Sequence, residues 1–197
     1  MTLIAVGILG ATGTVGQRFI ELLQKHPLFY IQGLGASPKS AGKPYKDVVS
    51  WKMTTPIPDQ IQEMVINNCD PEYFKDCKVI FSGLDASVAG KVELDFLNSN
   101  FVVFSNAKNH RMNPLVPLIV PTVNSDHLVL IDKQRQQFKT DGFLVTNANC
   151  STTGLVVALK ALQERFGTLS KVVVTTMQSV SGAGFLILIK VIRGSHL

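Results

Sequence analysis

The chain has 197 residues, and the 46% that are apolar are ample for a packed core, which excludes a largely disordered protein. Its formal net charge is +5 and its isoelectric point is near 9.2, but the 19 Lys and Arg residues never form a run, so we expect no nucleic-acid partner. No apolar stretch is long enough to span a membrane, and the short apolar beginning runs into a glycine turn, so we expect neither a membrane segment nor a secretory leader.

The first predicted strand, residues 3–9, leads through a glycine-rich turn into the first predicted helix. This order is typical of dinucleotide binding: Gly10 permits the tight turn, Gly13 lets backbone N–H groups approach a pyrophosphate, and Gly16 allows close packing of the helix. The helix N-terminus then favours the anion. The alternative is a plain turn that uses glycine only for its conformational freedom. We predict cofactor contacts from Gly10, Thr12, Gly13, Thr14 and Val15.

The second predicted strand, residues 30–36, is followed by a turn without an acidic residue. An NAD-preferring site usually has Asp or Glu there, to accept hydrogen bonds from the ribose 2′-hydroxyl. Ser37 and Ser40 instead offer hydroxyl donors, and Lys39 offers a cation for a 2′-phosphate. We therefore predict NADP as the cofactor, with a merely solvated turn as the alternative.

Further apolar runs rich in Val, Ile and Phe continue this pattern, at residues 78–82, 101–105, 116–120 and 143–146. Such runs suit strands that are covered on both faces, and helical spacing lies between several of them. The alternation predicts an α/β fold of the Rossmann type, with a doubly wound, mostly parallel sheet over residues 1–149. A helix near 151–166 and a strand at 171–177 then predict the start of a second, α+β domain at residues 150–185.

Cys150 lies between the last of these strands and the following helix. The unpaired N–H groups of a helix N-terminus stabilise a thiolate, which attacks carbonyl groups, and can bind an oxyanion. Asn149 could add a side-chain donor, while Ser151 or Thr152 could be simple caps. We interpret Cys69 and Cys77 as small buried apolar residues.

The three cysteines together also indicate the compartment. They lack the paired spacing of a metal site, and their odd number argues against a closed disulfide framework. We therefore expect no metal, a reducing environment and a cytoplasmic location.

Several motifs in their order along the chain resemble aspartate-β-semialdehyde dehydrogenase, and most closely its fungal and archaeal branch. They are GILGATGTVGQRF at 7–19, ASPKSAGKPY at 36–45 with Trp51-Lys52 after it, and the segments 105–112, 149–153 and 178–184. The resemblance covers residues 1 to about 185. It implies NADPH-dependent reduction of L-4-aspartyl phosphate to L-aspartate 4-semialdehyde, on the route to threonine, methionine and lysine, by a homo-oligomer that is a dimer or a tetramer.

The same resemblance implies roles for individual residues. Cys150, with Asn149 beside it, would be the nucleophile that forms a thioester, and Gln178 would orient the substrate. Arg111 would hold an anionic substrate group, because a guanidinium suits a carboxylate or a phosphate. Without the resemblance, Arg111 and Gln178 would be interpreted as a surface charge and a strand-edge amide. The cofactor would be lined further by Ser82, Gly83, Leu84 and Asn106, and near its nicotinamide by Ser181, Gly182, Ala183 and Gly184.

The end of the sequence departs from this pattern. The family continues into a long second domain that supplies a general acid/base histidine, whereas residues 186–197 form an apolar tail that does not match. None of His26, His110, His127 and His196 lies in the family's histidine motif. We therefore expect a chain that binds NADP but turns over substrate poorly.

Three other functions remain open on the sequence, two of them enzymes. An archaeal malonyl-CoA reductase would share the fold and the cysteine context, and an N-acetyl-glutamyl-phosphate reductase fits the surroundings of Cys150 less well. A noncatalytic NADP-binding module is the alternative from a different class. Substrate-dependent NADPH oxidation, as opposed to cofactor binding alone, distinguishes them.

Overall fold

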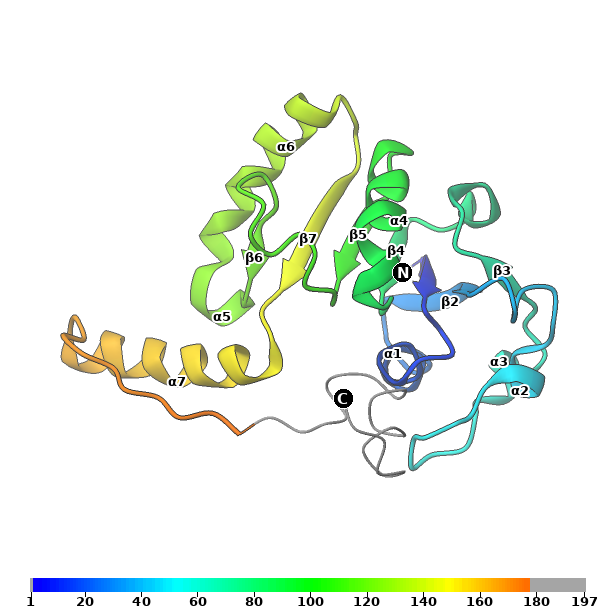
Figure 1. Ribbon diagram of the computed structural model, residues 1–197, viewed down its shortest axis with the longest axis horizontal. Helices are drawn as coiled ribbons and strands as arrows, with labels where there is room; N and C mark the ends of the chain where they lie inside the picture. Colours follow the sequence, from blue (N-terminus) through cyan, green and yellow to red (C-terminus); the bar gives the residue numbers. More distant parts are fainter. Residues whose placement is uncertain (1, 178–197) are drawn as a thin grey trace.

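The computed structural model describes residues 2–177 as a parallel sheet flanked by helices (Figure 1). Seven strands lie in the order β3-β2-β1-β4-β5-β7-β6, and all their pairings are parallel. The strands are β1 (Ile4–Leu9), β2 (Phe29–Ala36), β3 (Ile66–Asn68), β4 (Val79–Ser82), β5 (Val102–Ser105), β6 (Leu118–Ile119) and β7 (Phe143–Asn147). This order confirms the predicted doubly wound Rossmann architecture.

Helices of very different length connect the strands. The helices that pack on the sheet are α1 (Thr14–Leu23), α4 (Ala86–Asn98) and α6 (Leu130–Phe138), with single turns at α2 (Tyr45–Val48), α3 (Asp59–Gln62), α5 (Pro121–Asn124), η1 (Pro71–Phe74) and η2 (Ser125–Val129). The chain then continues into α7 (Cys150–Phe166). Within residues 2–177 no helix is both long enough and apolar enough to cross a bilayer.

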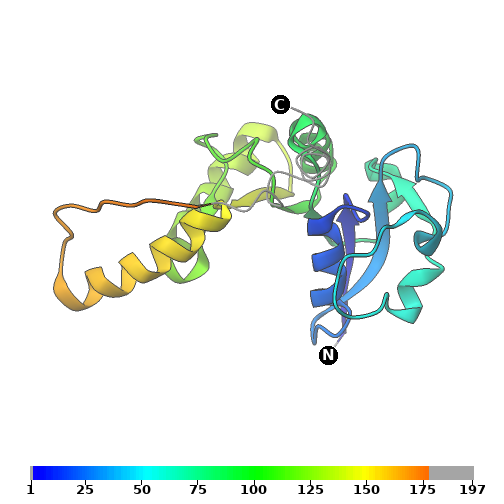
Figure 2. The same cartoon turned by 60° about the horizontal axis from the view of Figure 1, so that its bottom comes forward.

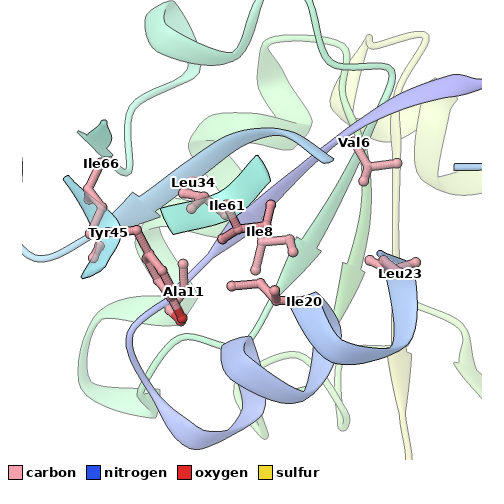
Figure 3. Packing of buried hydrophobic residues seen from close by; sticks show 10 residues of the cluster. Val6, Ile8, Ala11, Ile20, Leu23, Leu34, Tyr45, Ile61 and Ile66 are labelled. Atoms are coloured by element: carbon pink, nitrogen blue, oxygen red, sulfur yellow. The ribbon is translucent and has the colours of Figure 1, made fainter. Parts of the chain in front are cut away.

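The two faces of the sheet carry separate cores, because successive side chains of a strand point to opposite faces. Ile8 of β1 belongs to the first core, together with Ile20 of α1 and Ile61 of α3 (Figure 3). Leu9, the next residue, belongs to the second core, together with Phe96 of α4. Both faces of the central strands are therefore covered, as the apolar strand runs predicted.

One predicted strand is much shorter than expected, and one strand was not predicted. The run at 116–120 is reduced to the two residues of β6, because Pro117 has no N–H to give to a ladder and Pro121 begins α5. Strand β3 was not predicted, since its three residues, Ile66–Asn68, contain only one apolar side chain. It lies at the sheet edge, where such a short pairing with β2 suffices.

The chain leaves the sheet at α7, which extends away from it, and the segment that follows runs back past this helix (Figure 2). No residue of α7 is buried. The predicted strand at 171–177 is wrong: these residues form no regular element and are exposed. A strand needs a hydrogen-bonded neighbour, and no strand among residues 2–177 pairs with this segment.

The domain boundary near Asn149 stays a prediction. Gln178, the segment 181–184 and the apolar tail at 186–197 lie outside the described residues.

Candidate active site at the carboxyl edge of the sheet

The winding direction of the sheet reverses between β1 and β4. The chain winds from β1 outward through β2 to one edge and from β4 outward to the other, and in such sheets ligands bind at the carboxyl ends of the two strands where the direction reverses. The turn after β1 and the turn after β4 touch here: the Gly83 N–H donates to the Leu9 carbonyl (2.9 Å). The structure thus brings the predicted Gly10 turn beside the predicted segment Ser82 to Leu84.

The glycine turn has no room for side chains at two of its glycines. Gly10 has a φ of +71°, and a Cβ there would lie 2.6 Å from the Gly83 carbonyl oxygen. A Cβ at Gly16 would overlap the Gly10 carbonyl oxygen. These are the tight turn and the close helix packing that the sequence predicted.

Gly13 also closes the turn, while the approach of a pyrophosphate to this position stays a prediction. Its N–H donates to the Gly10 carbonyl (3.0 Å) and closes the turn, so this amide is used within the chain. Gly13 is also the N-cap of α1 and supplies no capping side chain, and the first helical turn contains no acidic residue. The N–H groups of Thr14 and Val15 lack intrahelical partners because they open the helix.

Two buried side chains, for which the sequence predicted no role, donate hydrogen bonds to backbone carbonyls of the turn. The Tyr45 hydroxyl donates to the Ala11 carbonyl (2.8 Å), and burial raises the pKa of Tyr45, so it stays a phenol donor. The Gln17 amide donates to the Thr12 carbonyl (2.9 Å) and accepts from the Lys52 N–H (2.7 Å). Both side chains bind carbonyl oxygens of the turn. The available signal in the sequence for these contacts was the amide side chain of Gln17 in the first turns of the predicted helix.

The predicted 2′-phosphate residues form a turn at the same edge of the sheet. Ser37 and Lys39 are exposed and Ser40 is half-buried. The N–H of Ser40 donates to the Ser37 carbonyl (2.9 Å), and Ala11 of the glycine turn donates to the Gly35 carbonyl at the end of β2 (3.0 Å). The turn is thus adjacent to the glycine turn, and its side chains are accessible to a ligand.

Cys150 is the first residue of α7 and is exposed. Its helix is capped by Asn149, whose side-chain oxygen accepts from the Thr152 N–H (2.8 Å), so neither Ser151 nor Thr152 is the cap. No acidic residue lies in the first helical turn. The thiol is therefore accessible at a helix N-terminus, where partial positive charge stabilises an anion.

The other cysteines agree with their predicted structural role. Cys77 is buried and Cys69 is half-buried. Burial raises the pKa of the Cys77 thiol to about 11 and also raises the pKa of Cys69.

Arg111 joins the ends of β5 and β7 beside this cysteine segment. Its guanidinium donates to the Asn147 carbonyl (2.9 Å) and to the Asn106 carbonyl (3.0 Å). The two asparagine side chains are themselves hydrogen-bonded at 2.6 Å. The Asn106 N–H donates to the Ser82 carbonyl (2.9 Å), so the network reaches the turn after β4. Arg111 is thus a half-buried, anchored cation at the strand end that leads to Cys150.

Comparisons with known proteins agree with this arrangement. The family model described as semialdehyde dehydrogenase, NAD binding domain, matches residues 5–131. The aspartate-semialdehyde dehydrogenase of Cryptococcus neoformans is 57% identical over 185 residues, which are 92% of this chain and 51% of that protein. The protein of the same name from Methanothermobacter thermautotrophicus is 46% identical over 183 residues, 93% of this chain and 52% of the relative.

A solved structure gives the same result in three dimensions. Aspartate semialdehyde dehydrogenase with NADP from Candida albicans superposes with a TM-score of 0.78 at 50% identity, over 85% of this chain and 48% of that one. The chain spans about half the length of the curated relatives it matches. Because the family model matches more than half of the chain, including the glycine turn and six of the seven strands, this chain belongs to the semialdehyde dehydrogenase NAD-binding-domain family.

Proposed function

We propose that this chain is the NADP-binding and nucleophile-bearing part of an aspartate-semialdehyde dehydrogenase, which reduces L-4-aspartyl phosphate to L-aspartate 4-semialdehyde. One observation carries the proposal: the carboxyl edge of a single parallel sheet holds the glycine turn, the anchored Arg111 and the segment leading to Cys150. Three kinds of group meet at this edge, namely a dinucleotide cradle, a cation and an accessible thiol. The names of the fungal and archaeal relatives support the choice of substrate.

The residues of the cradle fit a dinucleotide. A Cβ at Gly10 would clash with the Gly83 carbonyl, and no side chain caps the start of α1, which leaves amide donors for a pyrophosphate. Ser37, Lys39 and Ser40 would hold the 2′-phosphate, and Asn106 would contact the cofactor beyond the glycine turn. When bound, NADPH supplies a hydride to the acyl group.

The protein residues would carry the rest of the chemistry. The Cys150 thiolate would attack the acyl carbon of the substrate, forming a C–S bond while the C–O bond to phosphate breaks and phosphate leaves. The N-terminus of α7 would stabilise both the thiolate and the oxyanion of that attack. Arg111, oriented by two carbonyls, would bind an anionic group of the substrate. Gln178 would orient the substrate, and residues 181–184 would lie against the nicotinamide.

We further propose the setting in which this reaction works. The relatives' activity would place the chain in the synthesis of threonine, methionine and lysine, in a homo-oligomeric enzyme. Three free cysteines support a reducing compartment, and hence the cytoplasm.

Cofactor binding and thiol acylation test the proposal separately. We expect NADP+ to bind to the purified chain more tightly than NAD+ in a calorimetric titration. We expect L-aspartate 4-semialdehyde with NADP+ to add an acyl mass to Cys150, and C150S to abolish this addition. Malonyl-CoA-dependent NADPH oxidation would instead favour a malonyl-CoA reductase. Cofactor binding without any acylation would favour the noncatalytic module, and absence of NADP+ binding would refute both.

A further inference from the structure

A carboxylate without a role in the proposed chemistry lies under the candidate site. Glu93 of α4 has no exposed surface. Burying a carboxylate is costly unless hydrogen bonds or an opposite charge compensate, and an apolar residue of similar size often stabilises a fold equally well. The surroundings of this side chain therefore indicate what it does.

One carboxylate oxygen joins the ends of two strands. Oε1 of Glu93 accepts hydrogen bonds from the hydroxyls of Ser82 (2.6 Å) and Ser105 (2.7 Å), which are the last residues of β4 and β5. The Ser105 hydroxyl also accepts from the Ala107 N–H (3.0 Å), at the start of the segment that leads to Arg111. Glu93 thereby connects the turn after β4 with the turn after β5.

The other carboxylate oxygen faces a histidine. Within residues 2–177, Oε2 of Glu93 has no hydrogen-bond partner, and Nε2 of His110 lies 3.6 Å from it. The same nitrogen is 3.1 Å from the Gly90 carbonyl, and His110 is only 7% exposed. His110 immediately precedes Arg111, so the burial of the His110 side chain fixes the position of the neighbouring Arg111 backbone.

The groups that act on Glu93 come from two strand ends and from the segment after β5. Ser82 and Ser105 face Glu93 from β4 and β5, and His110 faces it from the segment after β5. On α4 itself, Lys91 and Asp95 pair with each other at the surface (2.7 Å). Burial raises the pKa of Glu93, and the two serines and His110 oppose that rise.

We propose that Glu93 is a positioning residue of the candidate site, which holds the turn after β4 and the Arg111 segment in the geometry that binds the dinucleotide. The inference rests on the proposed function, since the turn after β4 is taken to contact NADP. Glu93 itself touches neither cofactor nor substrate. It acts through Ser82, through Ser105 and through the placement of His110.

Three variants of the 197-residue chain test this, each measured for its NADP+ dissociation constant well below its melting temperature. Glu93→Leu keeps the volume but leaves two buried hydroxyls without an acceptor, so we expect the dissociation constant to rise about tenfold. Glu93→Gln keeps an acceptor oxygen, and we expect a dissociation constant within about twofold of the parent. Gln134→Leu is the matched control. Gln134 lies on α6 instead of α4, is equally buried, and is hydrogen-bonded to the backbone of Leu115 and Leu144.

The control separates positioning from general stability. Gln134→Leu should lower the melting temperature without changing the dissociation constant. Affinity that is unchanged in Glu93→Leu, or that falls equally in Gln134→Leu, would overturn the proposal. Where Glu93→Leu fails to fold, Ser105→Ala replaces it, with a rise of about threefold expected and an unchanged value counting against the proposal.

Amide hydrogen exchange provides a readout that does not need the cofactor. Loss of the Glu93 contacts should speed exchange at 83–84 and 106–112, and Gln134→Leu should not. A parent chain that fails to bind NADP+ would refute the proposed function, while exchange at these two segments would still decide the role of Glu93.

Discussion

The three cysteines differ in how much solvent they meet, and this difference determines their reactivity. Cys150 is exposed at the start of α7, while Cys77 is buried and Cys69 is half-buried with its thiol 3.5 Å from the Ala36 carbonyl. A thiol reacts as its thiolate, and burial raises the pKa of both Cys69 and Cys77.

We therefore expect iodoacetamide at neutral pH to alkylate Cys150 at least about tenfold faster than either other cysteine. Peptide mapping by mass spectrometry after a short exposure measures the three rates in one sample. Full alkylation in denaturant shows that all three peptides are detectable. Equal labelling of Cys77 and Cys150 in the folded chain would contradict the assignment.

Glu93 also determines how stability depends on pH. Burial raises its pKa above the ordinary value of 4.5, so the folded chain holds this proton more tightly than the unfolded chain does. The stability that follows from the raised pKa is present below 4.5 and is lost as the pH rises through the folded-state pKa. Glu93→Gln removes this loss.

The free energy of unfolding of Glu93→Gln, relative to the parent, should therefore increase between pH 5 and pH 8. Urea denaturation at both pH values, followed by circular dichroism, measures it. Glu63→Gln is the control, because Glu63 is an exposed partner of Lys46 at the surface. A difference that falls with pH would mean that Glu93 is stabilised as a carboxylate.

At the scale of elements, the first strand, turn and helix act as one unit. The turn is closed by the Gly13 N–H, held from behind by Tyr45 and Gln17, and packed against α1 at Gly16. Ala is the better helix former than Gly by about 1 kcal/mol, but a Cβ at Gly16 meets backbone atoms, which have no flexible end that could move away. The clash outweighs the propensity.

Gly16→Ala should therefore lower the free energy of unfolding by about 2 kcal/mol or more and weaken NADP+ binding. Gly154→Ala, within α7, is the matched control. Among residues 2–177, a methyl group added at Gly154 would have nothing within 4 Å outside its own helix, so helix propensity alone should act, with a gain of about 1 kcal/mol for α7. Thermal denaturation measures the stability of both variants, and calorimetric titration measures their NADP+ affinity. A Gly16→Ala chain as stable as the parent would contradict this, because it would show that the backbone of the turn can move to accommodate the methyl group.

At the scale of the whole molecule, stability is unevenly distributed. Helices α1 and α4 each bury four residues against the sheet, whereas α7 buries none. Val157, Leu162 and Phe166 of α7 are 43%, 45% and 76% exposed. Packing of one face against other elements supplies most helical stability in proteins, and α7 lacks such a buried face.

Amides in the middle of α7 should consequently exchange with deuterium at least about a hundredfold faster than those in the middle of α4. Mass spectrometry of peptic peptides from the 197-residue chain measures both helices together. Gly154→Ala should slow exchange in α7 and leave α4 unchanged. Equal protection of the two helices would show that α7 is covered in solution.

The sequence by itself determined the strand–turn–helix order, the parallel sheet, the dinucleotide turn and the place of Cys150 between a strand and a helix. These follow from signals within a few residues, namely apolar runs, glycines and caps. The tertiary structure decided which residues support the site, because those contacts join distant positions: Tyr45 to Ala11, Gln17 to Lys52 and Arg111 to Asn147. It also decided that residues 171–177 form no strand, since pairing needs a neighbour that an apolar run cannot supply alone.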